Sequence, residues 1–184
     1  GFNTAPWHAT YSAGGFPPMS AFIAAGSMQL AERDLPVAAD PWILSKRGAR
    51  RSVDPRRPYA YFAEAEHTRS GLVEDVAAIF ITNKECPFKC LMCDLWKNTT
   101  TVRVPAGAVP GQIEWALSRL RPCPHVKLYN SGNFFDAQAI PRADGADIAS
   151  LVRNHQTVLV ESHPKLVGRQ CLEFADLLGG ELQV

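Results

Sequence analysis

Strand-like and helix-like segments alternate along the chain from Val76 onward. Four short apolar runs rich in β-branched residues predict buried strands, at 76–83, 125–130, 157–162 and 181–184. Three segments with apolar residues at helical spacing lie between them, at 109–120, 144–154 and 165–180. This alternation is typical of βα units on a parallel sheet, so the sequence predicts an α/β protein whose strands are covered on both faces.

Polar segments follow three of the predicted strands. They read "NKECPFKCLMCDLWKN" at 83–98, "NSGNFFD" at 130–136 and "ESHP" at 161–164. Parallel sheets place their chemistry at the carboxyl ends of the strands, so we expect a site where these three segments meet. The last predicted strand leaves an open sheet edge. We therefore expect the chain to be the first half of a longer barrel, cut after about three βα units.

Three of the five cysteines lie within eight residues, as C-x3-C-x2-C: Cys86, Cys90 and Cys93. Thiolates on one tight loop can converge on a soft metal. The other two, Cys123 and Cys171, stand alone and are expected to be small buried apolar side chains. An odd number of clustered cysteines is not a secreted disulfide framework, so the sequence favours a reducing cytoplasm.

Three thiols leave the type of metal site open. A structural zinc site needs a fourth ligand, for which Asp94, His125 and His163 are candidates. A redox C-x2-C pair is less favoured, because a third cysteine lies so near. A [4Fe–4S] cluster normally takes four cysteines. With three, one iron keeps an open position, which is the mark of a catalytic metal site.

The cysteine motif directly after the first predicted strand resembles the radical S-adenosylmethionine superfamily. The resemblance implies a partial (β/α) barrel in which Cys86, Cys90 and Cys93 each ligate one iron of a [4Fe–4S] cluster. S-adenosylmethionine would chelate the fourth iron. An electron donor would reduce the cluster, which would cleave the cofactor to a 5′-deoxyadenosyl radical.

The resemblance also implies cofactor-binding residues. Met92 stands where the family commonly has an aromatic residue near the adenine, and Phe88 and Trp96 are alternatives for that role. The residues expected to hold the methionyl group, without the glutamate common in the family, are Asn130, Ser131 and Gly132.

The segment after the third predicted strand resembles a Glu-Ser-Arg-Pro segment of the superfamily. There Glu161 would accept hydrogen bonds from the ribose hydroxyls, and His163 stands where an Arg is often found. Over 41–184, with "NSGNFFD" and "ESHP" as the narrower signals, the chain is most similar to archaeosine-synthase-type proteins and their bacterial relatives. That branch also includes the elongator catalytic subunit and the tRNA methylthiotransferases, so tRNA is the implied substrate class.

The basic stretch 46–57 is either a phosphate-contacting arm or a solvated linker. The net charge of +1 gives no bulk attraction to nucleic acid or membrane, and no apolar run is long enough to span a bilayer.

We expect three parts: a loosely ordered segment 1–40, a basic lead-in 41–75, and the half-barrel 76–184. The start has neither a signal peptide nor an initiator Met, so we expect translation from Met19 or Met28, or an incomplete N-terminus. A zinc-binding module and an inactive fragment of a longer enzyme are the alternative functional hypotheses.

Overall fold

The computed structural model describes residues 40–184, so the expected loose segment falls outside the described residues except for Asp40. The strands are β1 (Ala60–His67), β2 (Val73–Phe80), β3 (His125–Tyr129), β4 (Thr157–Val160) and β5 (Glu181–Gln183). The α-helices are α1 (Asp40–Lys46), α2 (Ala108–Leu117), α3 (Gly145–Val152) and α4 (Arg169–Asp176). Short 3-10 turns are η2 (Leu95–Asn98), η3 (Arg142–Asp144) and η4 (Pro164–Leu166). None of these helices combines the length and the apolar character needed to cross a membrane.

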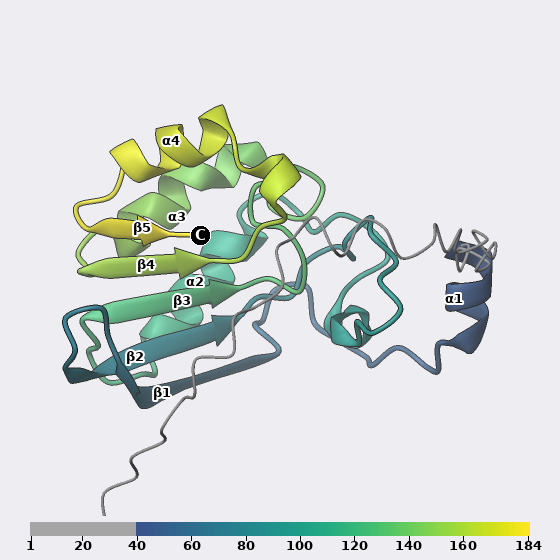
Figure 1. The fold of residues 1–184 in the computed structure, drawn as a ribbon, viewed down its shortest axis with the longest axis horizontal. Coiled ribbons are helices and arrows are strands. Elements are labelled where there is room, and N and C mark those ends of the chain that lie inside the picture. The colour runs from purple at the N-terminus through teal and green to yellow at the C-terminus, as the bar shows by residue number, and fades with distance from the viewer. Residues whose placement is uncertain (1–39) are drawn as a thin grey trace, which may run out of the picture. The chain divides into compact units, whose positions relative to one another are not determined.

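The strands form one five-stranded sheet in the order β1-β2-β3-β4-β5 (Figure 1). From β2 to β5 neighbouring strands are parallel, and α2, α3 and α4 make the successive connections. The first strand, β1, is antiparallel to β2 along its whole length, from Ala60 opposite Phe80 to His67 opposite Val73. The predicted α/β class with a mostly parallel sheet is confirmed. The described strands form an open sheet, so the barrel remains a prediction.

The core lies between the sheet and the three connecting helices, which cover one of its faces (Figure 1). Side chains alternate across a strand, so one set from β2, β3 and β4 points to the helices, including the fully buried Ile79, Leu128 and Val158. They pack with Ile113 of α2 and Ile148 of α3, which are also fully buried. The apolar periodicity of the sequence therefore identified this core.

The opposite face of the sheet mixes polar and charged side chains with apolar ones such as Phe62 and Phe80. No described helix covers it, so the expectation of helices on both faces is not met by the described residues. Lys127 of β3 is paired with Glu66 of β1, and His125 Nε2 lies 3.3 Å from Glu74 Oε2. His125 begins β3 and therefore lies at the amino end of the sheet. The cysteines follow the carboxyl end of β2, so the prediction of His125 as a zinc ligand is wrong.

Two elements differ from the prediction. Strand β1 falls in the range expected to be a basic lead-in, where Glu64 and Glu66 interrupt the apolar pattern on the uncovered face. Helix α4 begins at Arg169 and not at 165, because Pro164–Leu166 forms a separate turn and Gly168 has an extended backbone. Cys123 and Cys171 are partly buried against the core, close to the expectation.

A buried glutamine on α2 completes the backbone pairing just beyond β2. The fully buried Gln112 donates from Nε2 to the carbonyls of Thr82 and Pro55, both at 2.8 Å, and its Oε1 accepts from Thr82 N–H at 2.8 Å. Gln112→Leu would leave three backbone groups without a partner, so we expect the free energy of unfolding to fall by about 2 kcal/mol. Urea unfolding followed by circular dichroism measures this. The exposed Gln138→Leu is the control, and an equal loss in both variants would contradict the prediction.

Candidate functional site

The loops after β2, β3 and β4 meet at the carboxyl edge of the sheet. The cysteine loop lies so close to the loop after β3 that a Cβ atom on Gly132 would be 3.0 Å from the Cβ of Cys86. A side chain at position 132 would therefore crowd Cys86. The structure brings together Cys86 and the predicted loop 130–132, as expected for neighbouring parallel strands.

Cys86 is held more closely than the other two cysteines of the motif. Its Sγ accepts a hydrogen bond from Asn133 Nδ2 at 3.2 Å, and the backbone N–H of Phe88 is a second donor. Burial raises the pKa of the Cys86 thiol, and the nearby Cys90 and Cys93 raise it further, while the two donors act to lower it. The net shift is upward.

Cys90 is exposed and Cys93 is half-buried, and a tight turn joins them, with Cys93 N–H donating to Cys90 O at 3.1 Å. All three thiols are free. Within residues 40–184 no group of three or more His, Cys, Asp or Glu side chains is arranged to hold a metal ion. The three thiols on one loop thus fit a soft metal by their chemistry and chain position, while their sulfurs do not converge on one point.

The remaining zinc candidates lie near the loop. Asp94 is paired with Lys97, whose Nζ is 2.6 Å from Oδ2. The His163 ring stacks on Phe88 at 4.6 Å between centroids, and its Nδ1 accepts from Lys165 N–H. His163 therefore lies beside the cysteine loop with Nδ1 engaged, and it remains a candidate for the fourth ligand. The Phe88 ring is therefore occupied by its contact with His163.

Two arginines of the basic stretch brace the cysteine loop. Glu85, next to Cys86, accepts from Arg47 at 2.7 Å and from Arg50 at 2.5 Å, and Lys89 Nζ lies 2.7 Å from the same carboxylate. Partial burial acts to raise the pKa of Glu85, but the hydrogen bonds from Lys89, Arg50 and Arg47 outweigh it and lower the pKa to about 2. We call Arg47, Arg50 and Glu85 the arginine brace.

The arginine brace also covers Trp96. The Arg47 guanidinium lies 4.9 Å from the ring centroid, and Arg50 donates to the Trp96 carbonyl at 2.6 Å. Trp96 is only 8% exposed and packs under the arginine brace, and its alternative role against an adenine stays a prediction. Arg47 and Arg50 are thus engaged within the protein. Neither interpretation of the basic stretch, a phosphate-contacting arm or a solvated linker, applies to these two residues.

A hollow of about 200 Å³ opens at the carboxyl ends of β2, β3 and β4, and it contains two predicted residues, Ser131 and Glu161. The hydroxyl oxygens of Ser131 and Tyr59 are 3.1 Å apart. Burial raises the pKa of Glu161, opposed by a hydrogen bond from the Asn130 backbone. The rings of Phe80 and Tyr129, 5.0 Å apart, line the same hollow. A ligand with a planar ring and hydroxyl groups suits this combination of aromatic and acceptor groups.

Two residues of this hollow have features that the sequence did not indicate. Burial raises the pKa of Tyr59, the Ser131 hydrogen bond lowers it, and the charge of Glu161 raises it. Tyr59 was missed because it lies in the stretch expected to be a lead-in. Ser131 has a φ of 52°, which is rare for a residue other than glycine and is concentrated at functional sites.

Buried polar atoms without a partner among the described residues lie just past each of the three strands. They are Thr82 Oγ1 and Asn83 Oδ1 after β2, both amide atoms of Asn130 after β3, and Ser162 Oγ after β4. Buried polar groups are nearly always hydrogen-bonded, so this edge can accept further polar partners. The Asn130 side chain is fully buried, and only its backbone N–H reaches Glu161.

Met92 is 86% exposed and lies away from Ser131 and Glu161. It lines a separate hollow of about 210 Å³ between α1 and the cysteine loop, together with Ile43 and Leu91. Its predicted contact with an adenine stays a prediction.

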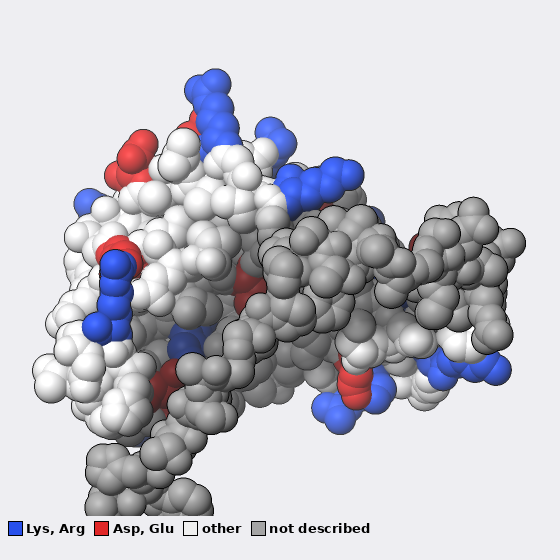
Figure 2. Space-filling model, viewed as in Figure 1, with Lys and Arg blue, Asp and Glu red and all other residues white. Residues whose placement is uncertain are grey.

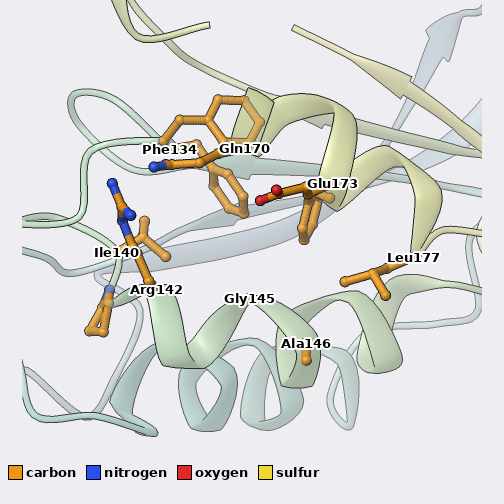
Figure 3. A pocket seen from close by; sticks show the side chains of 11 residues that line it. Phe134, Ile140, Arg142, Gly145, Ala146, Gln170, Glu173 and Leu177 are labelled. Atoms are coloured by element: carbon orange, nitrogen blue, oxygen red, sulfur yellow. The ribbon is translucent and has the colours of Figure 1, made fainter. Parts of the chain in front are cut away.

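A further hollow of about 210 Å³ lies between α3 and α4, on the helix side of the sheet (Figure 3). Its apolar wall includes Phe134 and Phe174, and Arg142 and Gln170 point toward each other at its rim (Figure 3). With the Gln170 amide oriented to satisfy both ends, its oxygen accepts from Arg142 Nη2 at 2.5 Å. None of the predicted site residues lines this hollow.

Comparisons with models of known families, with curated proteins and with solved structures find no match for this chain.

On the described part of the face in Figure 2, Lys and Arg side chains are interspersed with Asp and Glu.

Proposed function

We propose that this chain binds a [4Fe–4S] cluster through Cys86, Cys90 and Cys93 and is a radical S-adenosylmethionine enzyme. The observation that carries the proposal is the set of three free thiols on the loop after β2, of which Cys86 lies against Gly132, the neighbour of Ser131 in the hollow. A metal with an open position would there adjoin a hollow suited to a nucleoside. When bound, the cluster and S-adenosylmethionine would supply a 5′-deoxyadenosyl radical.

The chain's own residues would position and shield these groups. The arginine brace fixes the start of the cysteine loop, and Glu161 would accept hydrogen bonds from ribose hydroxyls. The loop 130–132 would present backbone groups to the methionyl end of the cofactor. Tyr59 and Tyr129 would wall the hollow and exclude water from it.

A tRNA substrate is a further part of the proposal. It is supported by the resemblance and by exposed cations of the basic stretch, Lys46, Arg51 and Arg56. If these contact phosphates, the affinity for tRNA falls with added salt, and the slope of log K against log salt drops in an Arg51→Ala, Arg56→Ala double variant.

Anaerobic reconstitution with iron and sulfide tests the metal assignment. The proposal expects a brown protein with broad visible absorption and about four irons per chain. A colourless protein that retains one zinc would overturn it. That outcome would favour the second candidate, a zinc-binding module, for which the position of His163 beside the cysteine loop is the supporting observation.

The third hypothesis is an inactive fragment of a longer enzyme. A longer reading frame that cleaves S-adenosylmethionine, compared with an inactive chain of 184 residues, would favour it.

A further inference from the structure

One side chain, Asn133, connects the loops that follow β2, β3 and β4. Its Nδ2 donates to Cys86 Sγ at 3.2 Å, and its Oδ1 accepts from the backbone N–H of His163 at 2.6 Å. The next residue, Phe134, donates from its backbone to the Glu161 carbonyl at 2.7 Å. The first cysteine of the motif is thus tied to the loop that contains Glu161.

The orientation of the Asn133 amide follows from its partners. A backbone N–H can only donate, so the amide atom that faces His163 N–H must be the oxygen. The NH₂ group therefore faces the sulfur of Cys86. Asn133 is 2% exposed, so water does not compete readily for this donor. A donor aimed at sulfur binds a thiolate more strongly than a neutral thiol.

We propose that Asn133 is a positioning residue that orients the Cys86 sulfur as a ligand for a soft metal and couples that ligand to the loop after β4. The inference rests on the proposed function only in requiring that Cys86 bind a metal. Cys90 is exposed, so Cys86 is the ligand that the fold orients before the metal arrives. Donors to metal ligands typically account for a 10–100-fold change in metal affinity.

Anaerobic titration with Co²⁺ tests this without any assay of activity, because cobalt bound by thiolates shows sulfur-to-metal charge-transfer absorption. Asn133→Asp keeps the acceptor for His163 N–H and replaces the donor to sulfur by a second oxygen. We expect Co²⁺ affinity to fall by about 10–100-fold. The charge-transfer absorbance per bound cobalt should fall by about a third, as expected for two thiolates in place of three. Asn133→Leu removes both hydrogen bonds of the side chain, and we expect the same falls in cobalt affinity and absorbance.

The matched control is Asn154→Asp, the same chemical change at an exposed position between α3 and β4, outside the cysteine motif. Affinity and absorbance equal to wild type in Asn133→Asp would overturn the proposal, and so would a wild-type protein that binds no cobalt. If neither variant folds, ¹⁵N-labelled wild type loaded with ¹¹³Cd²⁺ decides the matter. A scalar coupling between cadmium and an Asn133 amide proton supports the hydrogen bond to a ligating sulfur, and its absence refutes it.

Cobalt binding that depends on Asn133, in a protein that forms no iron–sulfur cluster, would contradict the proposed function and leave this inference standing.

Discussion

The Cys90→Ala variant is expected to assemble almost no [4Fe–4S] cluster and to lose reductive cleavage of S-adenosylmethionine. The proposed cluster has only three protein ligands, so removing one thiolate leaves too few to retain the iron. Cys90 is exposed, and substitutions at such positions usually change stability by less than about 0.5 kcal/mol, so the loss would reflect chemistry and not unfolding. Iron content, visible absorbance and 5′-deoxyadenosine formation measure it.

The control for this experiment is Cys171→Ala. Cys171 is a thiol on α4, partly buried against the core and outside the motif. We expect this variant to keep its cluster. Retained cleavage activity in Cys90→Ala would refute the ligand assignment, and equal loss of iron in both variants would indicate adventitious binding to thiols.

Replacing Glu85 by Gln is expected to lower the free energy of unfolding by about 3 kcal/mol at neutral pH. The change removes one negative charge from among Arg47, Arg50 and Lys89 and leaves three cations close together. The pKa of Glu85 falls from the ordinary 4.5 to about 2 in the folded protein. Such a shift corresponds to about 3 kcal/mol.

The lowered pKa of Glu85 decides over which pH range its contribution to stability is lost. The folded-state pKa of Glu85 lies below the unfolded value of 4.5, so its contribution is complete above that pH and is lost as the pH falls toward about 2. Wild type should therefore lose stability across this window more steeply than Glu85→Gln. Denaturant unfolding at a series of pH values measures the difference.

The matched control is Glu114→Gln, at an exposed position on α2. It should leave both the stability and its pH profile close to wild type. A Glu85→Gln variant as stable as wild type, with the same acid dependence, would show that the arginine brace contributes little to folding.

The fold was predictable where one face of an element is buried. Ile79, Leu128 and Val158 alternate with other residues in strands covered by helices on one side, and this produces a clear apolar signal. Strand β1 was missed because Glu64 and Glu66 lie on the uncovered face of the sheet, where polar residues carry no cost.

The candidate site was predictable to the level of its loops. The rule that parallel strands end at one edge brought Cys86 and Gly132 together from their sequence positions alone. The same rule excludes His125 from the cysteine site, because His125 begins strand β3 and so lies at the opposite edge of the sheet. Asn133 and the arginine brace depend on long-range contacts, such as that between Arg50 and Glu85, which no local pattern encodes.

The two edge strands of the sheet differ in direction, because β1 is antiparallel to its neighbour and β5 is parallel to its neighbour. It pairs with β2 along its whole length, so the hydrogen-bonding edge of the first parallel strand is already used. A ring of parallel strands closes when the last strand pairs with the first, and here that place is taken by a strand of the opposite direction. Among the described strands a further parallel strand can therefore pair with β5 but not with β2, so a closed ring would have to include β1 as an antiparallel member.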